Sequence, residues 1–290
     1  MANIASTVRR KVTNWVVTVV RKDGMQGTKP DVLVTEEPME IRAESPSQLV
    51  RPIAVTMRTP GHDFELAVGF LFTEGIIKNS EDVRTVRYCQ LPDSAEQKFN
   101  VVTVSLAHQF DEALLRRGMV TSASCGICGT TSIDQLFTTV GHINAGVGPV
   151  MTSQMLIALP EIIRQSQPTF DRTGGLHAAG LVDAQGGAYC VREDIGRHNA
   201  VDKVIGKAVL DNQLPISRYA LVVSGRLSFE IIQKAGMAGI AFIAAVGAPS
   251  SLAVETADEL GITVVGFVRD GTANVYTHGH RVIGQDLSIR

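Results

Sequence analysis

Two cysteines stand two residues apart in the segment TSASCGICGTTS, residues 121–132. Cys125 and Cys128 are each followed by a glycine, and the flanking residues are small and mostly hydroxylated. Such a stretch adds little to a core, and its glycines give the backbone conformational freedom. The pattern predicts a mobile loop that carries sulfur, for which three chemistries are known: metal binding, dithiol exchange and persulfide relay.

Metal binding and dithiol exchange both fit this pair poorly. A closed zinc site needs four ligands, whereas no second C-x-x-C occurs, and Cys89 and Cys190 stand alone in strand-like segments. A thioredoxin-type pair begins a helix after a strand, where the helix dipole lowers the thiol pKa. In a persulfide relay, a thiolate takes a sulfur atom from a donor and delivers it elsewhere. We therefore favour relay over the other two and over an incidental pair.

A histidine follows in GGLHAAG, residues 174–180. His177 together with the cysteine pair is similar to the zinc deaminase signature, H-x-E followed by P-C-x-x-C. However, Ala179 occupies the position of the catalytic glutamate, and the cysteines precede the histidine. Hydrolytic zinc deamination is not expected, although the sheet could still be deaminase-like.

The segment VREDIGRHNAVDKVIG, residues 191–206, is rich in charge for a junction between a strand and a helix. Arg197 and Lys203 close to a helix N-terminus predict an oxyanion site. His198 and Asn199 add side chains that no capping rule requires. The alternative is an ordinary solvated helix start.

Ser224, Gly225 and Arg226 form a second junction of this kind. Gly225 allows the backbone to approach a ligand, and Arg226 can bind a phosphate through two parallel hydrogen bonds. The Walker A pattern is absent. Residues 247–251 repeat the arrangement, and an ordinary turn between strand and helix is the alternative for both.

A third polar stretch comprises Phe267, Val268, Arg269, Asp270, Gly271 and Thr272. The Phe267 ring can stack on a base, and Arg269 can contact a phosphate. Asp270 and Gly271 form a common turn pair. Several such loops on one sheet edge favour a large anionic ligand that contains a nucleotide.

The segments that position these loops alternate between strand and helix from about residue 174. Strands are predicted near 177–183, 188–192, 219–224, 240–245 and 262–267, and helices near 196–210, 227–236 and 251–260. This alternation predicts a largely parallel sheet covered by helices, with ligands at the carboxyl ends of the strands. The loops at Arg192, Ser224, Gly247 and Phe267 should therefore open at one edge.

The preceding part of the chain is predicted to be α+β. Strands are expected at 13–20, 32–42, 83–89 and 100–106, and helices at 110–118 and after Thr152. Pro38 indicates an edge strand or a bulge. Asp63 is expected to cap a helix that stops at Gly75, and Pro160 is expected to kink the later helix.

Composition excludes several function classes. The 290 residues are 44% hydrophobic and carry a net charge of −2, so no basic field indicates nucleic acid. One Trp and four Tyr also argue against a base-stacking platform. The apolar stretch from Trp15 to Val20 is shorter than a signal sequence requires, and no segment is predicted to span a membrane. We expect a cytoplasmic protein with reduced cysteines.

Seven segments carry a resemblance to a known family. They are EEPMEIR, TPGHDFELAVGFLFTEGII, SCGICG, GGLHAAG, REDIGRHNAVDKVIG, SGRLSFEIIQKA and GFVRDGTANVYT, which fall between Glu36 and Thr277. Together they resemble the formate dehydrogenase accessory sulfurtransferase family of the FdhD type. The match spans nearly the whole chain, and the motifs are specific in combination.

The resemblance implies a function and a set of partners. Family members accept persulfide sulfur from a cysteine desulfurase and pass it to the molybdenum cofactor, Mo-bis(molybdopterin guanine dinucleotide). That cofactor then activates formate dehydrogenase. The resemblance also implies a homodimer, Cys125 as the persulfide carrier with Cys128 as its partner, and residues 267–272 as cofactor-binding. Family members often carry glycine directly after Arg269, where this chain has Asp270.

The expected fold class is α+β followed by α/β, in two domains. Residues 1–140 are predicted to form a smaller α+β domain that ends in the 121–132 loop. Residues 141–290 are predicted to form a cytidine-deaminase-like domain with an αβα layered, mostly parallel sheet and no zinc. This domain should bind the molybdenum cofactor, for which a guanine nucleotide can substitute, through residues 267–272 and Ser224, Gly225, Arg226, His198 and Asn199. The alternative functions are a zinc-dependent deaminase-like hydrolase and a non-catalytic cofactor chaperone.

Overall fold

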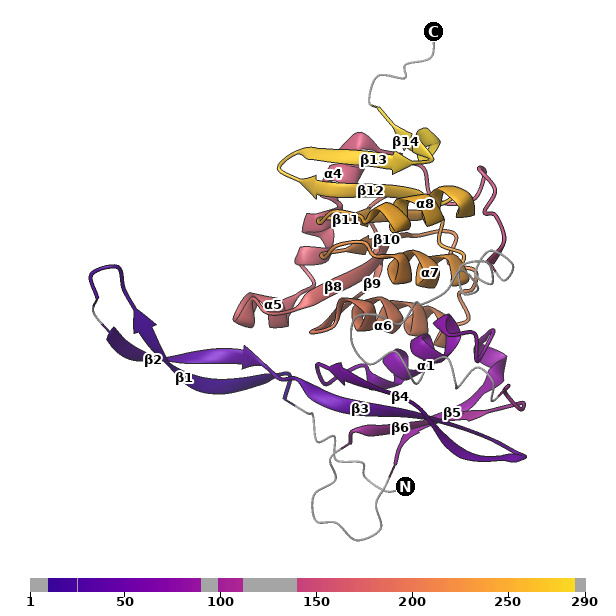
Figure 1. The fold of residues 1–290 in the computed structure, drawn as a ribbon. Helices are drawn as coiled ribbons and strands as arrows, with labels where there is room; N and C mark the ends of the chain where they lie inside the picture. Colours follow the sequence, from indigo (N-terminus) through magenta and orange to yellow (C-terminus); the bar gives the residue numbers. More distant parts are fainter. Residues whose placement is uncertain (1–9, 25, 90–98, 112–139, 285–290) are drawn as a thin grey trace.

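A computed structural model describes residues 10–24, 26–89, 99–111 and 140–284 (Figure 1). The N-terminal part begins with a hairpin of β1 (Val12–Val20) and β2 (Gln26–Val34), which extends away from the rest of the chain as an arm. A four-stranded sheet follows, in the order β4-β3-β6-β5. Its strands are β3 (Glu37–Ser45), β4 (Gln48–Arg58), β5 (Val83–Tyr88) and β6 (Val101–Leu106).

The single strand predicted at 32–42 is in fact two strands, because β2 ends at Val34 and β3 begins at Glu37. The prediction that Pro38 marks an edge strand or a bulge is also wrong, since β3 lies between β4 and β6. Pro38 pairs with Met57 of β4, whereas pairing with β6 begins only at Glu40. The proline therefore occupies the start of the strand, where it is tolerated.

Helix α1 (Asp63–Thr73) lies against the four-stranded sheet (Figure 1). Its N-cap is His62, in a left-handed conformation, and Asp63 is the first helical residue instead of the cap. Gly75 has a φ of 74° and follows the C-cap Glu74, as the predicted stop requires. A short 3-10 helix, η1 (Ser80–Asp82), then leads into β5.

The C-terminal part is built on a six-stranded sheet in the order β13-β12-β11-β10-β8-β9. The strands are β8 (His177–Val182), β9 (Ala188–Asp194), β10 (Ala220–Val223), β11 (Phe242–Ala245), β12 (Thr263–Arg269) and β13 (Thr272–Thr277). Only β10, β11 and β12 pair in parallel, and the other three neighbouring pairs are antiparallel. The sheet is thus mixed, and the prediction of a mostly parallel sheet is wrong.

Short connections explain two of the three antiparallel pairs. Five residues join β8 to β9 and two join β12 to β13, whereas parallel strands need a crossover of a dozen or more residues. Because β8 runs opposite to both β9 and β10, those two strands point the same way. The carboxyl ends of β9, β10, β11 and β12 therefore still lie at one edge.

Helices cover both faces of this sheet (Figure 1). One face is covered by α6 (Arg197–Leu210), α7 (Phe229–Met237) and α8 (Ser251–Leu260), close to the predicted ranges. The other is covered by α4 (Ser153–Arg164), which has Pro160 within it and is followed by α5 (Pro168–Thr173). Two short strands, β7 (Met151–Thr152) and β14 (Val282–Ile283), pair beside η3 (Gly279–Arg281).

The two parts of the chain meet where α1 crosses α6. A Cβ atom on Gly69 would lie 1.8 Å from the carbonyl oxygen of Asp202, and one on Gly206 would lie 1.8 Å from that of Glu65. Only glycine permits this approach. One hydrophobic core runs through the crossing and contains side chains from both sheets. A boundary between domains at residue 140 stays a prediction. Among the described residues, no helix has the length and apolar character needed to span a membrane.

Candidate functional site

Three loops pack together at the shared edge of the six-stranded sheet. The Gly247 amide donates to the carbonyl oxygen of Gly225, and the Phe267 amide donates to that of Gly247, both at 3.2 Å. A Cβ atom on Gly247 would lie 2.8 Å from the Gly225 oxygen. The loops after β10 and β11 and the irregular end of β12 at Phe267 are thus brought together by backbone contacts that a larger residue would prevent.

Ser224 and His177 stand side by side at this edge. The Ser224 Oγ accepts a hydrogen bond from the Ala178 amide at 2.9 Å. The Nδ1 atom of His177 lies 3.3 Å from the position of a Cβ on Gly225. Burial lowers the pKa of His177, and the neighbouring Arg197 lowers it further. The pattern GGLHAAG indicated His177 only as a possible zinc ligand, whereas the structure places it as a neutral imidazole among the cofactor-binding candidates.

His198 lies between the first turns of α6 and α7. Its Nε2 atom is 3.1 Å from the Ser228 Oγ and 3.8 Å from the Glu230 carboxylate. Burial lowers the pKa of His198 to about 4, with further lowering by Arg197 and Lys234. At neutral pH this side chain is therefore an uncharged donor and acceptor, and it adds no positive charge for a phosphate.

We expect the His198 imidazole to titrate near pH 4, well below the ordinary value of 6.5. The unfolded chain takes up this proton near pH 6.5 and the folded chain does not, so folding stability falls as the pH drops from 6.5 toward 4. The His198 Cε1 proton shift, followed by NMR, measures the pKa. A His198→Gln variant should lose less stability over the same pH range. A midpoint near 6.5 would contradict the assignment.

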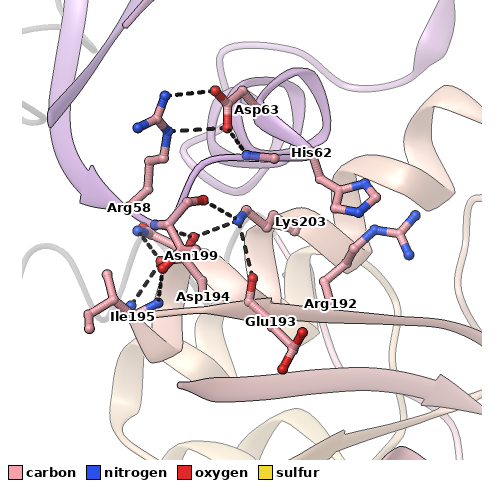
Figure 2. Close-up of polar contacts among 12 residues, drawn as sticks. Arg58, His62, Asp63, Arg192, Glu193, Asp194, Ile195, Asn199 and Lys203 are labelled. Carbon is pink, nitrogen blue, oxygen red and sulfur yellow. Dashed lines mark hydrogen bonds and ion pairs between the residues drawn. The ribbon is translucent and has the colours of Figure 1, made fainter. Parts of the chain in front are cut away.

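Asn199 lies in the junction between the two parts of the chain (Figure 2). Its Nδ2 atom donates to the Met57 carbonyl oxygen at 2.8 Å and to Asp194 Oδ1 at 3.0 Å. The Thr56 hydroxyl donates to its Oδ1 atom. The amide is thus fully engaged with protein groups, and it ties β4 to the start of α6.

Lys203 is also part of this junction (Figure 2). Its Nζ atom is 2.6 Å from Asp194 Oδ2 and donates to the carbonyl oxygens of Thr59 and Glu193. Both charged side chains are almost completely buried. The ammonium group is therefore neutralised inside the protein, where it is not exposed to an external anion.

Two further ion pairs, which no sequence pattern indicated, hold the junction. Arg58, fully buried, donates to Asp63 at 2.8 and 3.2 Å. Arg192 donates to Glu65 at 2.5 and 2.8 Å, which directs it into the junction and away from the sheet edge. Burial alone would raise the pKa of Glu65, but the hydrogen bonds from Arg192 and His62 lower it to about 2.

Two guanidinium groups remain available beside the edge. The Arg197 Nε atom, at the start of α6, is buried and has no hydrogen-bond partner among the described residues. Arg226 is exposed, in the loop that leads to α7. Arginine binds phosphate through paired donors and retains its charge at any physiological pH. These side chains, not Lys203, supply positive charge to the edge.

Residues 267–272 form the hairpin that joins β12 to β13. Arg269 pairs with Thr272, which leaves Asp270 and Gly271 as a two-residue loop. Their φ angles are 52° and 73°, as a type I′ turn requires, and Asp-Gly is a preferred sequence for it. Asp270 therefore has a backbone role in the turn.

Phe267 interrupts the regular pairing of β12 with β13. The register shifts between Gly266 and Arg269, and Phe267 has a φ of 52°. A left-handed conformation is strained for an aromatic residue, and such strain clusters at ligand sites. The Arg269 guanidinium lies 5.3 Å from the centroid of the Phe267 ring, while Val268 is buried. The bulge thus presents an aromatic ring and a cation together.

Cys125 and Cys128 lie outside the described residues, as does the rest of the 121–132 loop. Of the cysteines that are described, Cys190 is buried, and burial raises the pKa of its thiol to about 12. A thiol of this kind does not form the thiolate that sulfur transfer requires. Within the described ranges, no group of three or more His, Cys, Asp or Glu side chains is arranged to hold a metal ion.

Comparisons with known proteins agree on one family. The FdhD/NarQ family profile matches residues 34–283. The Sulfur carrier protein FdhD of Streptomyces coelicolor is 48% identical over 280 residues, 95% of each chain. That of Mycobacterium tuberculosis is 47% identical over 262 residues, 88% of this chain and 93% of that protein.

A solved structure has a similar fold. It is that of a candidate formate dehydrogenase accessory protein from Desulfotalea psychrophila, with a TM-score of 0.73 and 23% sequence identity. The alignment covers 94% of this chain and 100% of that one. The mixed α/β architecture described above is therefore shared with it.

Proposed function

Because this chain belongs to the FdhD/NarQ family, we propose that it is a sulfurtransferase for the molybdenum cofactor of formate dehydrogenase. It takes sulfur from a cysteine desulfurase and passes it to Mo-bis(molybdopterin guanine dinucleotide), which is its bound substrate. The relatives' printed name, sulfur carrier protein, supports sulfur as the cargo.

The observation that carries this proposal is the set of three loops packed at one sheet edge. Arg226 lies on one of them, and the ring of Phe267 and the guanidinium of Arg269 lie on another. An acceptor with pyrophosphate groups and flat bases needs cations and apolar ring faces close together. We assign phosphate binding to Arg226 and the backbone of Ser224 and Gly225, and base binding to the 267–272 hairpin.

The sulfur step is assigned to Cys125. Its thiolate attacks the terminal sulfur of the donor's Cys–S–SH group, and the donor cysteine leaves as a thiolate. The product is Cys125–S–SH. One sulfur atom is thus transferred from the donor cysteine to Cys125, and no external oxidant is required. Cys128 is assigned as the partner thiol, which either shares the sulfur or displaces it as sulfide with formation of a disulfide.

The N-terminal and C-terminal parts of the chain have different roles in this proposal. Residues 1–140 supply the sulfur-carrying loop, and residues 141–290 hold the acceptor. His198 lies within reach of the Ser228 hydroxyl beside the acceptor, whereas Asn199 supports α6 from the protein side. Assembly as a homodimer belongs to the same proposal.

Mass spectrometry of the purified protein tests the sulfur step directly. After incubation with a cysteine desulfurase and L-cysteine, the protein is expected to gain one sulfur, about 32 Da, on the peptide that contains residues 121–132. The gain should disappear on reduction with dithiothreitol, because a persulfide is reducible. A protein that never gains sulfur, yet still binds the cofactor, would instead be a non-catalytic chaperone. Stoichiometric zinc held by the cysteines would instead indicate a hydrolase.

A further inference from the structure

A cavity of about 610 Å³ opens beside the sheet edge, between α4, α5 and the ends of β8, β10 and β11. Its size falls within the range of small-molecule sites. The walls are apolar and come from Pro160, Ile163, Phe170, Leu176 and Val246. Of these residues, only Val246 belongs to the loops considered so far, because it follows β11.

Gln167 is the unusual residue of this cavity. It is 3% exposed and lines the wall, and its side-chain amide forms no hydrogen bond within the described part of the chain. Gln167 is the N-cap residue of α5, and its side chain does not cap the helix. Among the described residues, the Arg197 Nε is the fully enclosed side-chain atom without a partner, so the Gln167 amide is not fully enclosed and keeps access to the cavity that its side chain lines. The Gln167 amide is therefore a candidate for binding a ligand.

Glu193 explains why the Gln167 side chain is not used to cap α5. Its carboxylate accepts hydrogen bonds from the backbone amides of Thr169 and Phe170, at 3.1 and 2.7 Å. These are the first-turn amides that a capping side chain would otherwise bond. The cap of α5 is thus supplied from β9, and the amide of Gln167 is left for another partner.

The cavity is also lined by two charged side chains, Glu161 and Arg164, and by two further polar side chains. His177 and Ser224 line it from the sheet edge, so the cavity is continuous with the acceptor site. At its rim, Arg164 pairs with Asp171 and lies over the Phe170 ring, 4.7 Å from the ring centroid. Apolar walls combined with a free amide suit a flat, neutral heterocycle that has both donors and acceptors on one edge.

We propose that this cavity binds one fused ring of the acceptor and that the Gln167 amide recognises its lactam edge. The proposal rests on the function proposed above. Guanine and pterin both carry a ring N–H next to a carbonyl, and an amide side chain can accept from the first and donate to the second. The apolar walls cover the faces of the ring. Gln167 is then a specificity-determining residue, separate from the hairpin at 267–272.

Ligand binding to purified full-length variants tests this proposal. GDP, ADP and the free pterin neopterin are titrated into the wild type and into Gln167→Met, which keeps the length of the side chain but removes its hydrogen bonds. Loss of two neutral hydrogen bonds should weaken binding about tenfold. We expect this loss for GDP if guanine occupies the cavity, or for neopterin if the pterin does. ADP has no lactam edge, so its affinity should not change.

Gln165→Met is the matched control, because Gln165 is two residues away and exposed. It should bind all three compounds as the wild type does. Equal affinity of Gln167→Met and the wild type for both GDP and neopterin would overturn the proposal, as would a wild type that binds neither. An equal loss for all three compounds would overturn it too, because it would indicate a general structural defect. Sulfur loading of the 121–132 peptide is measured on the same samples, so failure of the cavity assignment is distinguishable from failure of sulfur transfer.

Discussion

A Cys125→Ala variant is expected to gain no sulfur from a cysteine desulfurase and to leave formate dehydrogenase inactive in cells that lack the native protein. Alanine has no atom that can attack a persulfide or hold the transferred sulfur, so the loss should reach the background of the assay. GDP binding should stay at the wild-type level, because the acceptor site that we propose is built from other loops. The mass of the 121–132 peptide and the formate dehydrogenase activity of cell extracts are the two measurements.

Cys89→Ala is the control for removal of a thiol. Cys89 follows β5 and lies outside the 121–132 loop, so this variant should load sulfur and activate formate dehydrogenase normally. Cys128→Ala should still gain one sulfur on Cys125, since the first attack does not involve Cys128. If Cys125→Ala gained sulfur on Cys128, or fully activated the dehydrogenase, the carrier role of Cys125 would be wrong.

Regular alternation of strands and helices made most of the C-terminal part predictable. The boundaries of α6 and α8 differ by at most one residue from those predicted, because a glycine or serine stands at the N-cap and the apolar spacing is helical. The direction of neighbouring strands was missed at β8, and β13 itself was not predicted. Its residues are mostly exposed, so no apolar run marked it as a strand. Asp270-Gly271 was recognised as a turn. It can be identified as the loop of a β-hairpin only when the strand that follows it, β13, is known.

The loops at the sheet edge were also predictable, since carboxyl ends of strands that point the same way meet at one edge. The roles of Asn199 and Lys203 were not. Their partners Thr56, Met57 and Thr59 lie 142 to 144 residues away in the sequence. The first two are on β4 and Thr59 directly follows it, and Pro52 and mixed polarity concealed that strand. Charged side chains near the start of a helix form the same sequence pattern in two cases: when they bind a ligand anion, and when they bind a group of the protein itself. Only the tertiary contacts distinguish the two.

We expect Lys203→Met to be strongly destabilising. It leaves the Asp194 carboxylate buried without its cation, although the amides of Thr59 and Gly196 still donate to it. Breaking a buried ion pair on one side typically costs about 3–5 kcal/mol. Urea denaturation at pH 7 should show a loss of this size. Lys207→Met is the matched control, because Lys207 is one turn further along α6 and forms a half-exposed pair with Asp211. Its loss should be below about 1 kcal/mol.

A double variant separates the two explanations of such a loss. If the cost comes from the unpaired charge, then Asp194→Asn combined with Lys203→Met should be less destabilised than Lys203→Met alone, because no buried charge remains. If the cost comes from the hydrogen bonds of Lys203 to Thr59 and Glu193, then the double variant should be at least as unstable as the single one.

The hydrogen bonds of Lys203 join β9 to the loop before α1. If the double variant is the more stable of the two, charge neutralisation is therefore the main force that holds the sheet edge to the N-terminal part. A Lys203→Met protein no less stable than Lys207→Met would show that the junction does not depend on this pair.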